Sequence, residues 1–240
     1  MRDLSNIWVY LSASPLLHLT LTLAAYQIGL AIYRRTKLSP LFNPVLVSVV
    51  LIVSVLLATS TRYETYFGGA QFVHFLLGPA TVALAIPLYR QLELVRRSAL
   101  ALLVSIVAGS LTAAFSAMAI GWLLGCSRDT LISLAPKSVT TPVAMGIAER
   151  LGGLPSLTAA LVILTGILGS IMGTSILNGL GIKDWAARGV AMGTASHGIG
   201  TARALQVNEV AGAFAGLAMG LNALASALLL PLLLKFLFSN

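Results

Sequence analysis

A lysine and three hydroxyl residues lie between two prolines in the stretch PKSVTTP, from Pro136 to Pro142. Each proline removes a backbone donor and disfavours helical backbone at the residue before it, here Ala135 and Thr141. The stretch therefore predicts a break in a helix, after which Thr141 caps a new helix with Pro142 at its first position. Lys137 would add a full positive charge near the positive end of that half-helix, an arrangement that favours anions.

A second polar stretch, GTASHGIGTARAL, covers residues 193–205 in an apolar context. Glycine occurs three times within eight of its positions, at Gly193, Gly198 and Gly200. These glycines predict breaks in the helix and allow close approach of a ligand or a second helix. If the stretch is partly helical, His197, Thr201 and Arg203 are near enough to share one face and the next turn.

Together the two stretches predict a substrate-binding site for an anion. Lys137 and Arg203 would neutralise its charge, and His197 could carry a coupled proton because imidazole titrates near neutral pH. The hydroxyl groups that could hydrogen-bond the anion belong to Ser138, Thr140, Thr141, Ser196 and Thr201. A purely structural reading stays open, in which Lys137 reaches the interface or pairs with Asp129 or Glu149.

An earlier segment has a similar start. Gly78 and Pro79 predict another helix break, and Thr81 would then line an opposing half-helix. Residues 78–91 and 135–148 align at an offset of 57, so repeated units around 65–126 and 128–182 are an open alternative within a single transmembrane domain over residues 1–240.

The rest of the chain is strongly apolar. Of its 240 residues, 58% are hydrophobic and 9% are charged, whereas a soluble domain carries about 25% charged residues. The charge-free runs cover residues 4–33, 38–61, 65–89, 98–127, 151–182 and 210–234. Each run reaches the roughly 20 residues that a helix needs to cross a bilayer. We therefore expect an all-α polytopic membrane protein with seven or eight hydrophobic segments, some discontinuous or re-entrant.

Basic residues between these runs predict an orientation. One side would carry Arg34, Arg35, Lys37, Arg90, Arg96 and Arg97, and the other Arg2, Arg62 and Arg128. The positive-inside rule then places the N-terminus outside, and it explains the net charge without nucleic acid. Residues 130–148 and 189–207 either span or re-enter, and re-entry of the first is preferred because it keeps later basic residues inside.

The sequence contains no signal for catalysis or for a cofactor. It has one cysteine, no H-E-x-x-H motif and no carboxylate pair, so we expect no metal, no cofactor and no enzymatic activity. Overlapping GxxxG patterns at Gly212, Gly216 and Gly220 predict packing seams for helices, inside one chain or between the protomers of a dimer.

Three stretches carry a family resemblance: PKSVTTPVAMGIAERLGG at 136–153, TGILGSIMG at 165–173 and RGVAMGTASHGIGTARAL at 188–205. They closely resemble the LrgB/CidB family of bacterial membrane proteins, and the match covers essentially the whole chain. The resemblance implies a bacterial inner-membrane location and a fold related to cation:proton antiporters and anion transporters. It also implies a small LrgA-like membrane partner.

Two functions agree with the residues and the resemblance. The first is a secondary transporter of small monocarboxylates, such as pyruvate, glycolate or lactate, coupled to H⁺ or Na⁺. The resemblance implies this through the related module of the plastid glycolate/glycerate translocator. The alternative is an antiholin-like regulator of murein hydrolase activity and cell lysis that acts through association with membrane proteins. The first depends on Lys137, and the second on the glycine seams.

Overall fold

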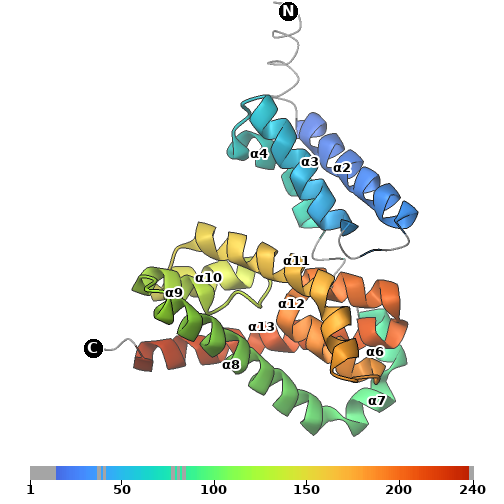
Figure 1. The fold of residues 1–240 in the computed structure, drawn as a ribbon, viewed down its shortest axis with the longest axis vertical. Coiled ribbons are helices and arrows are strands. Elements are labelled where there is room, and N and C mark those ends of the chain that lie inside the picture. The colour runs from blue at the N-terminus through green and yellow to red at the C-terminus, as the bar shows by residue number, and fades with distance from the viewer. Residues whose placement is uncertain are drawn as a thin grey trace, which may run out of the picture. The chain divides into compact units, whose positions relative to one another are not determined.

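The computed structural model describes residues 15–36, 39, 42–76, 79, 82 and 85–237, and every regular element among them is a helix (Figure 1). Four of the helices are long and apolar enough to cross a membrane: α2 (Pro15–Arg35), α8 (Ala99–Leu123), α11 (Pro155–Gly179) and α13 (Glu209–Leu237). The shorter α3 (Pro44–Ala58) is also apolar. The prediction of an all-α polytopic membrane protein is confirmed.

The chain forms two compact units, Met1–Ala83 and Leu84–Asn240. The first contains α2, α3 and α4 (Tyr63–Phe75), and α2 packs against both of the others. His18 of α2 is buried, with its ring edge-on to Tyr66 of α4 at a centroid distance of 5.8 Å. His18 is therefore a packing residue. A single transmembrane domain with internal repeats stays a prediction.

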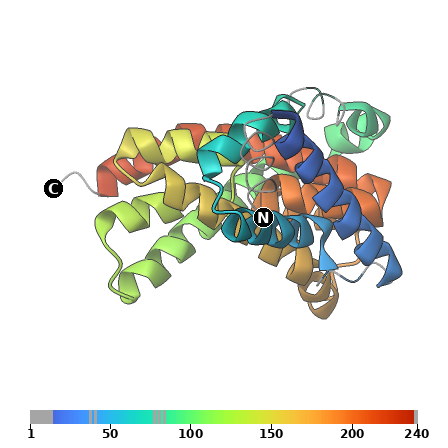
Figure 2. The same ribbon diagram turned by 90° about the horizontal axis from the view of Figure 1, so that it is seen from above.

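The second unit holds the two polar stretches. Its helices are α6 (Ala85–Arg90), α7 (Leu92–Arg97), α8, α9 (Arg128–Leu134), α10 (Thr141–Leu151), α11, α12 (Trp185–Val207) and α13. The last two run side by side in Figure 1 and in the rotated view of Figure 2, where they are orange and red. Gly189 and Gly193 of α12 lie so close to the Ala211 and Ala215 carbonyl groups of α13 that a Cβ would overlap them. Because glycine has no side chain, these two positions allow α12 and α13 to pack closely.

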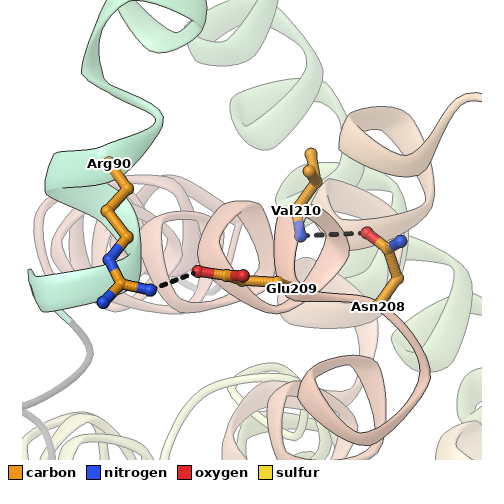
Figure 3. A network of polar contacts seen from close by, with 4 residues as sticks. All are labelled: Arg90, Asn208, Glu209 and Val210. Carbon is orange, nitrogen blue, oxygen red and sulfur yellow. Dashed lines mark hydrogen bonds and ion pairs between the residues drawn. The ribbon is translucent and has the colours of Figure 1, made fainter.

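A single residue, Asn208, connects α12 to α13. Its side-chain oxygen accepts a hydrogen bond from the Val210 amide at 2.9 Å (Figure 3), which satisfies a donor at the start of α13. The neighbouring Glu209 forms an ion pair with Arg90 of α6 at 3.0 Å, shown in the same view. These contacts fix the tight corner that makes α12 and α13 neighbours.

α9 and α10 both pack against the same end of α11. The Ser133 hydroxyl of α9 accepts from the Leu154 amide at 2.8 Å, and the Thr158 hydroxyl donates to the Ser133 carbonyl at 3.2 Å. Residues 152–154 alone separate α10 from α11. At the tip between α9 and α10, Val139 packs with Val162 of α11. The chain thus runs out along α9 and returns along α10, and re-entry of residues 130–148 into the membrane stays a prediction.

Two details of the helix break between α9 and α10 were predicted wrongly. Ala135 keeps right-handed helical backbone (φ −54°, ψ −49°), because the Lys137 amide still closes a turn on the Leu134 carbonyl at 3.2 Å. The N-cap of α10 is Thr140 (φ −61°, ψ 142°), so Thr141 is helical and Pro142 follows it. A proline disfavours helical backbone before it but does not forbid it.

The break in α12 also differs from the prediction. It lies at His197, whose backbone adopts φ 41° and ψ −134°, next to Gly198. Gly193 and Gly200 have helical backbone, since Gly193 serves the contact with α13 and Gly200 lies against Ser196 of its own helix. Of the earlier predicted break, Pro79 is helical and exposed. Gly78 and Thr81 lie outside the described residues.

Candidate functional site

The two broken helices meet at Asn222 of α13. Its Nδ2 donates to the Ser138 carbonyl in the α9–α10 loop at 3.0 Å and to the Thr194 carbonyl in α12 at 3.1 Å. Asn222 is 1% exposed and lies near the centre of α13. Inside a bilayer, carbonyl groups at a helix break need an internal donor. One amide side chain therefore supplies a donor to both breaks.

A short polar chain orients the Asn222 amide. Its oxygen accepts from the Ser226 hydroxyl at 3.5 Å, and Ser226 shares a 3.0 Å hydrogen bond with Ser110 of α8. All three side chains are buried. With the oxygen side facing Ser226, the nitrogen side faces the two carbonyl groups.

Lys137 lies at the tip of the α9–α10 loop and is half-buried. Its Nζ donates to the Ser138 hydroxyl at 3.1 Å. The ion pairs among the described residues are Arg62–Glu64, Arg90–Glu209 and Arg97–Glu93, all exposed. Asp129 and Glu149, the two structural partners considered for Lys137, are exposed and form none of them. The Lys137 ammonium thus has no carboxylate partner in the part of the chain that the structure describes.

His197 forms the second part of the site. Its Nε2 donates to the Val162 carbonyl of α11 at 2.9 Å, because a carbonyl can only accept. Nδ1 is then the nitrogen that can take up a proton. Positive φ at a non-glycine residue costs roughly 1–3 kcal/mol and is common at functional sites. Lys137 lies close enough for its charge to act on the imidazole.

Glycines of α11 make room for this arrangement. A Cβ at Gly166 would lie 2.7 Å from the His197 imidazole, and one at Gly169 would overlap the Ser196 hydroxyl. Gly173, one turn further along α11, faces Met192 of α12 in the same way. The TGILGSIMG stretch thus holds α12 against α11 at the break.

The other predicted residues fall into three groups. Thr140 and Thr141 are half-buried at the start of α10. Ser196 is buried beside α11, and the Thr201 hydroxyl donates to the His197 carbonyl at 2.8 Å, so its hydrogen is already used. Arg203 is half-buried six residues past His197, which is about 9 Å along the helix axis. Its place in the site stays a prediction.

Sequence reasoning assigned no role to Asn222, which joins the two stretches. A signal was present, because this residue is the one asparagine in the charge-free run 210–234. Polar side chains inside a membrane usually bond across helices or mark a functional site. The two acceptors of Asn222 could not be predicted, because a sequence does not show which backbone carbonyl groups a side chain will reach. No group of three potential metal ligands occurs among the described residues.

Comparisons with known proteins place this arrangement in a family. Residues 22–236 match the LrgB-like family. The chain is 33% identical over 225 residues to the holin-like protein CidB of Staphylococcus epidermidis, across 94% of this chain and 97% of that protein. It is 30% identical over 223 residues to the antiholin-like protein LrgB of Bacillus cereus, across 93% and 97% of the two chains.

A third relative is the protein YxaC of Bacillus subtilis, 38% identical over 212 residues, which are 88% of this chain and 92% of that protein. No solved structure matches the chain. The family and the names of its members describe holin-like and antiholin-like membrane proteins, not enzymes. The resemblance seen in the sequence is confirmed, and the chain belongs to the LrgB-like family.

Proposed function

We propose that this protein is a secondary transporter that binds a small monocarboxylate, such as pyruvate, glycolate or lactate, where its two broken helices meet. The observation that carries the proposal is the Lys137 ammonium, half-buried at a helix break without a carboxylate partner among the described residues. An ionisable group at such a place is costly unless it serves a ligand or a transport path. A single anionic group would neutralise it.

The start of α10 adds to this attraction for an anion. The first-turn amide groups of a helix lack partners within the helix and carry partial positive charge. The Thr140 side chain makes no capping hydrogen bond to them. A bound carboxylate could accept from these amides, from the Ser138 hydroxyl and from Lys137. Half-helix starts serve anionic substrates in this way in secondary transporters.

His197 provides a route for coupling to protons. With Nε2 committed to the Val162 carbonyl, Nδ1 would gain and lose the proton close to the bound anion. Protonation of His197 would then favour anion binding, and deprotonation would favour release. Na⁺ is the alternative coupling ion.

A regulatory function is the second candidate, and the names of the relatives favour it. CidB is called holin-like and LrgB antiholin-like, which suggests control of murein hydrolase activity and lysis through association with other membrane proteins. Gly220 of α13 supports this reading, because nothing lies within 4 Å of the position that a Cβ would occupy. That open glycine could take a helix of a second copy or of an LrgA-like partner.

The proposed setting is the bacterial inner membrane, with the N-terminus outside, a dimeric assembly and no contact with nucleic acid. The test is uptake of radiolabelled pyruvate, glycolate and lactate into proteoliposomes that contain this protein, with and without a proton gradient. Saturable uptake should be lost in Lys137→Ala and kept in Lys183→Ala, which removes an exposed lysine.

Normal uptake by a well-folded Lys137→Ala protein would refute the site. If the wild type takes up none of the three anions, alone or with an LrgA-like protein, the regulatory reading is favoured. That reading predicts that Gly220→Leu impairs partner binding and control of lysis, while Lys137→Ala leaves both intact.

A further inference from the structure

A cavity of about 470 Å³ lies between α8, α12 and α13, on a different side of Thr194 from the Asn222 contact. Small residues form part of its wall, with Ser105 and Gly109 on α8 and Ala187 and Ala191 on α12, and the larger apolar Leu102, Val190 and Phe214 complete it. The small residues recur every four positions, so each pair lies on one face of its helix. The volume falls within the range of small-molecule sites, roughly 300–1,000 Å³.

The cavity runs from one end of these helices to their middle. Ser98 and Asp184, at its mouth, are the residues that precede α8 and α12. Thr194, at its inner end, comes ten residues after Asp184, which is about 15 Å along the axis. That distance is about half of a hydrocarbon core of roughly 30 Å. The cavity therefore reaches the layer of the two helix breaks.

Thr194 brings a fully buried hydroxyl group to the inner end. Its side chain is 5% exposed, and its hydroxyl has no hydrogen-bond partner in the described structure. A buried hydroxyl without a partner is unfavourable, so this position calls for water or a ligand. The carbonyl of the same residue is held by Asn222, which also holds the Ser138 carbonyl. The Asn222 side chain thus lies between the Thr194 carbonyl beside the cavity and the Ser138 carbonyl at the proposed anion site.

We propose that this cavity is a water-filled access route to the anion site, and that the Thr194 hydroxyl donates a hydrogen bond to the transported carboxylate. The proposal rests on the proposed transport function. The cavity extends to the end where α8 begins, whereas the α9–α10 loop comes in from the end where α8 finishes. The two features therefore approach the same layer from opposite sides of the membrane, as alternating access requires.

The carboxylate at the mouth is compatible with an anion route. Asp184 accepts a hydrogen bond from the Ala187 amide at 2.8 Å, in the first turn of α12. The positive end of the helix therefore offsets part of its charge. The remaining lining residues are uncharged, and they include the apolar Leu102, Val190 and Phe214 besides serine, glycine and alanine.

Cysteine labelling tests whether the cavity holds water. The full-length protein is reconstituted in liposomes with Cys126, the one native cysteine, replaced by serine. Single cysteines are then introduced as Ser105→Cys and Ala191→Cys in the cavity, and as Val104→Cys outside it. Val104 is the neighbour of Ser105 on α8, 59% exposed and not part of the cavity wall.

A charged, water-soluble methanethiosulfonate should modify the two cavity cysteines at least about tenfold faster than Val104→Cys. The reason is that only a thiol in contact with water ionises to the reactive thiolate. Equal rates at all three positions would overturn the proposal. So would unreactive cysteines at both cavity positions, which would mean that lipid or a partner helix fills the space.

Uptake kinetics test the hydroxyl. Thr194→Val keeps the shape of the side chain and should raise the KM for pyruvate by about tenfold or more, the typical effect of losing a hydrogen bond to a charged group. Thr194→Ser should restore a KM near that of the wild type. Neither change should lower thermal stability, because the hydroxyl makes no hydrogen bond within the protein.

An unchanged KM in Thr194→Val would refute the role of the hydroxyl. The labelling result is independent of transport. If the wild type shows no uptake but the cavity cysteines are labelled, the transport function fails while the water-filled cavity stands. If uptake is normal but the cavity cysteines do not react, the access route fails while the transport function stands.

Discussion

The Asn222 side chain donates to the Ser138 carbonyl at 3.0 Å, across 84 positions of the sequence. The same amide group reaches the Thr194 carbonyl at 3.1 Å. A long apolar helix thus carries one amide that holds two broken segments in the same layer. The tip that carries Lys137 and the turn that carries His197 are thereby kept close together, which is what a shared anion site requires.

Asn222→Leu should destabilise the protein strongly. The leucine leaves the Ser138 and Thr194 carbonyl groups without their donor, and each buried carbonyl left unpaired costs about 1–3 kcal/mol. We expect a loss of roughly 2–4 kcal/mol, measured by thermal or denaturant unfolding in detergent. Ser116→Ala, at an exposed position of α8, should change stability by less than about 0.5 kcal/mol. Similar stability of the two variants would contradict the bridging role.

Two glycine substitutions should act in opposite directions. A Cβ at Gly166 would lie 2.7 Å from the His197 ring, whereas a Cβ at Gly146 of α10 meets nothing within 4 Å. Gly166→Ala should therefore lower stability by about 1–3 kcal/mol through overpacking. Gly146→Ala should raise it by about 0.5–1 kcal/mol, because alanine favours the helix. Melting temperatures of the two purified variants decide this, and a stable Gly166→Ala protein would mean that the imidazole lies elsewhere.

Lys137→Met should abolish uptake without loss of stability. Methionine has a similar length and no charge, so it removes the cost of half-burying an ammonium that no carboxylate offsets in the described residues. We expect a melting temperature equal to or above that of the wild type. Lys183→Met, at an exposed position, should leave both properties unchanged. A drop of several degrees in Lys137→Met would instead indicate a structural role for this lysine.

His197→Asn should separate binding from proton coupling. Asparagine tolerates positive φ better than most residues, so the break in α12 can persist, but the titrating nitrogen is lost. Anion uptake should then no longer be stimulated by a proton gradient, as measured by initial rates with and without the gradient. His18→Asn, in the packed contact with Tyr66, should keep the stimulation. Full stimulation in His197→Asn would assign coupling to another group.

Much of the site could be predicted from the backbone preferences of neighbouring residues in the sequence. The prolines of PKSVTTP forecast a helix break between α9 and α10, and the loop at residues 135–140 lies there. The glycine-rich stretch forecast a broken α12, although the break falls on His197. These features depend on the φ and ψ preferences of a few neighbouring residues, which the sequence records directly.

By itself, the sequence determined that the chain is a bundle of membrane-crossing helices with two polar breaks, because bilayer thickness and backbone hydrogen bonding act on contiguous segments. Only the tertiary structure decided which residues meet. It brought Asn222 to both breaks and Val162 to His197. The physical reason is that contacts between distant helices depend on how their small residues let them pack, and on where backbone carbonyl groups then point.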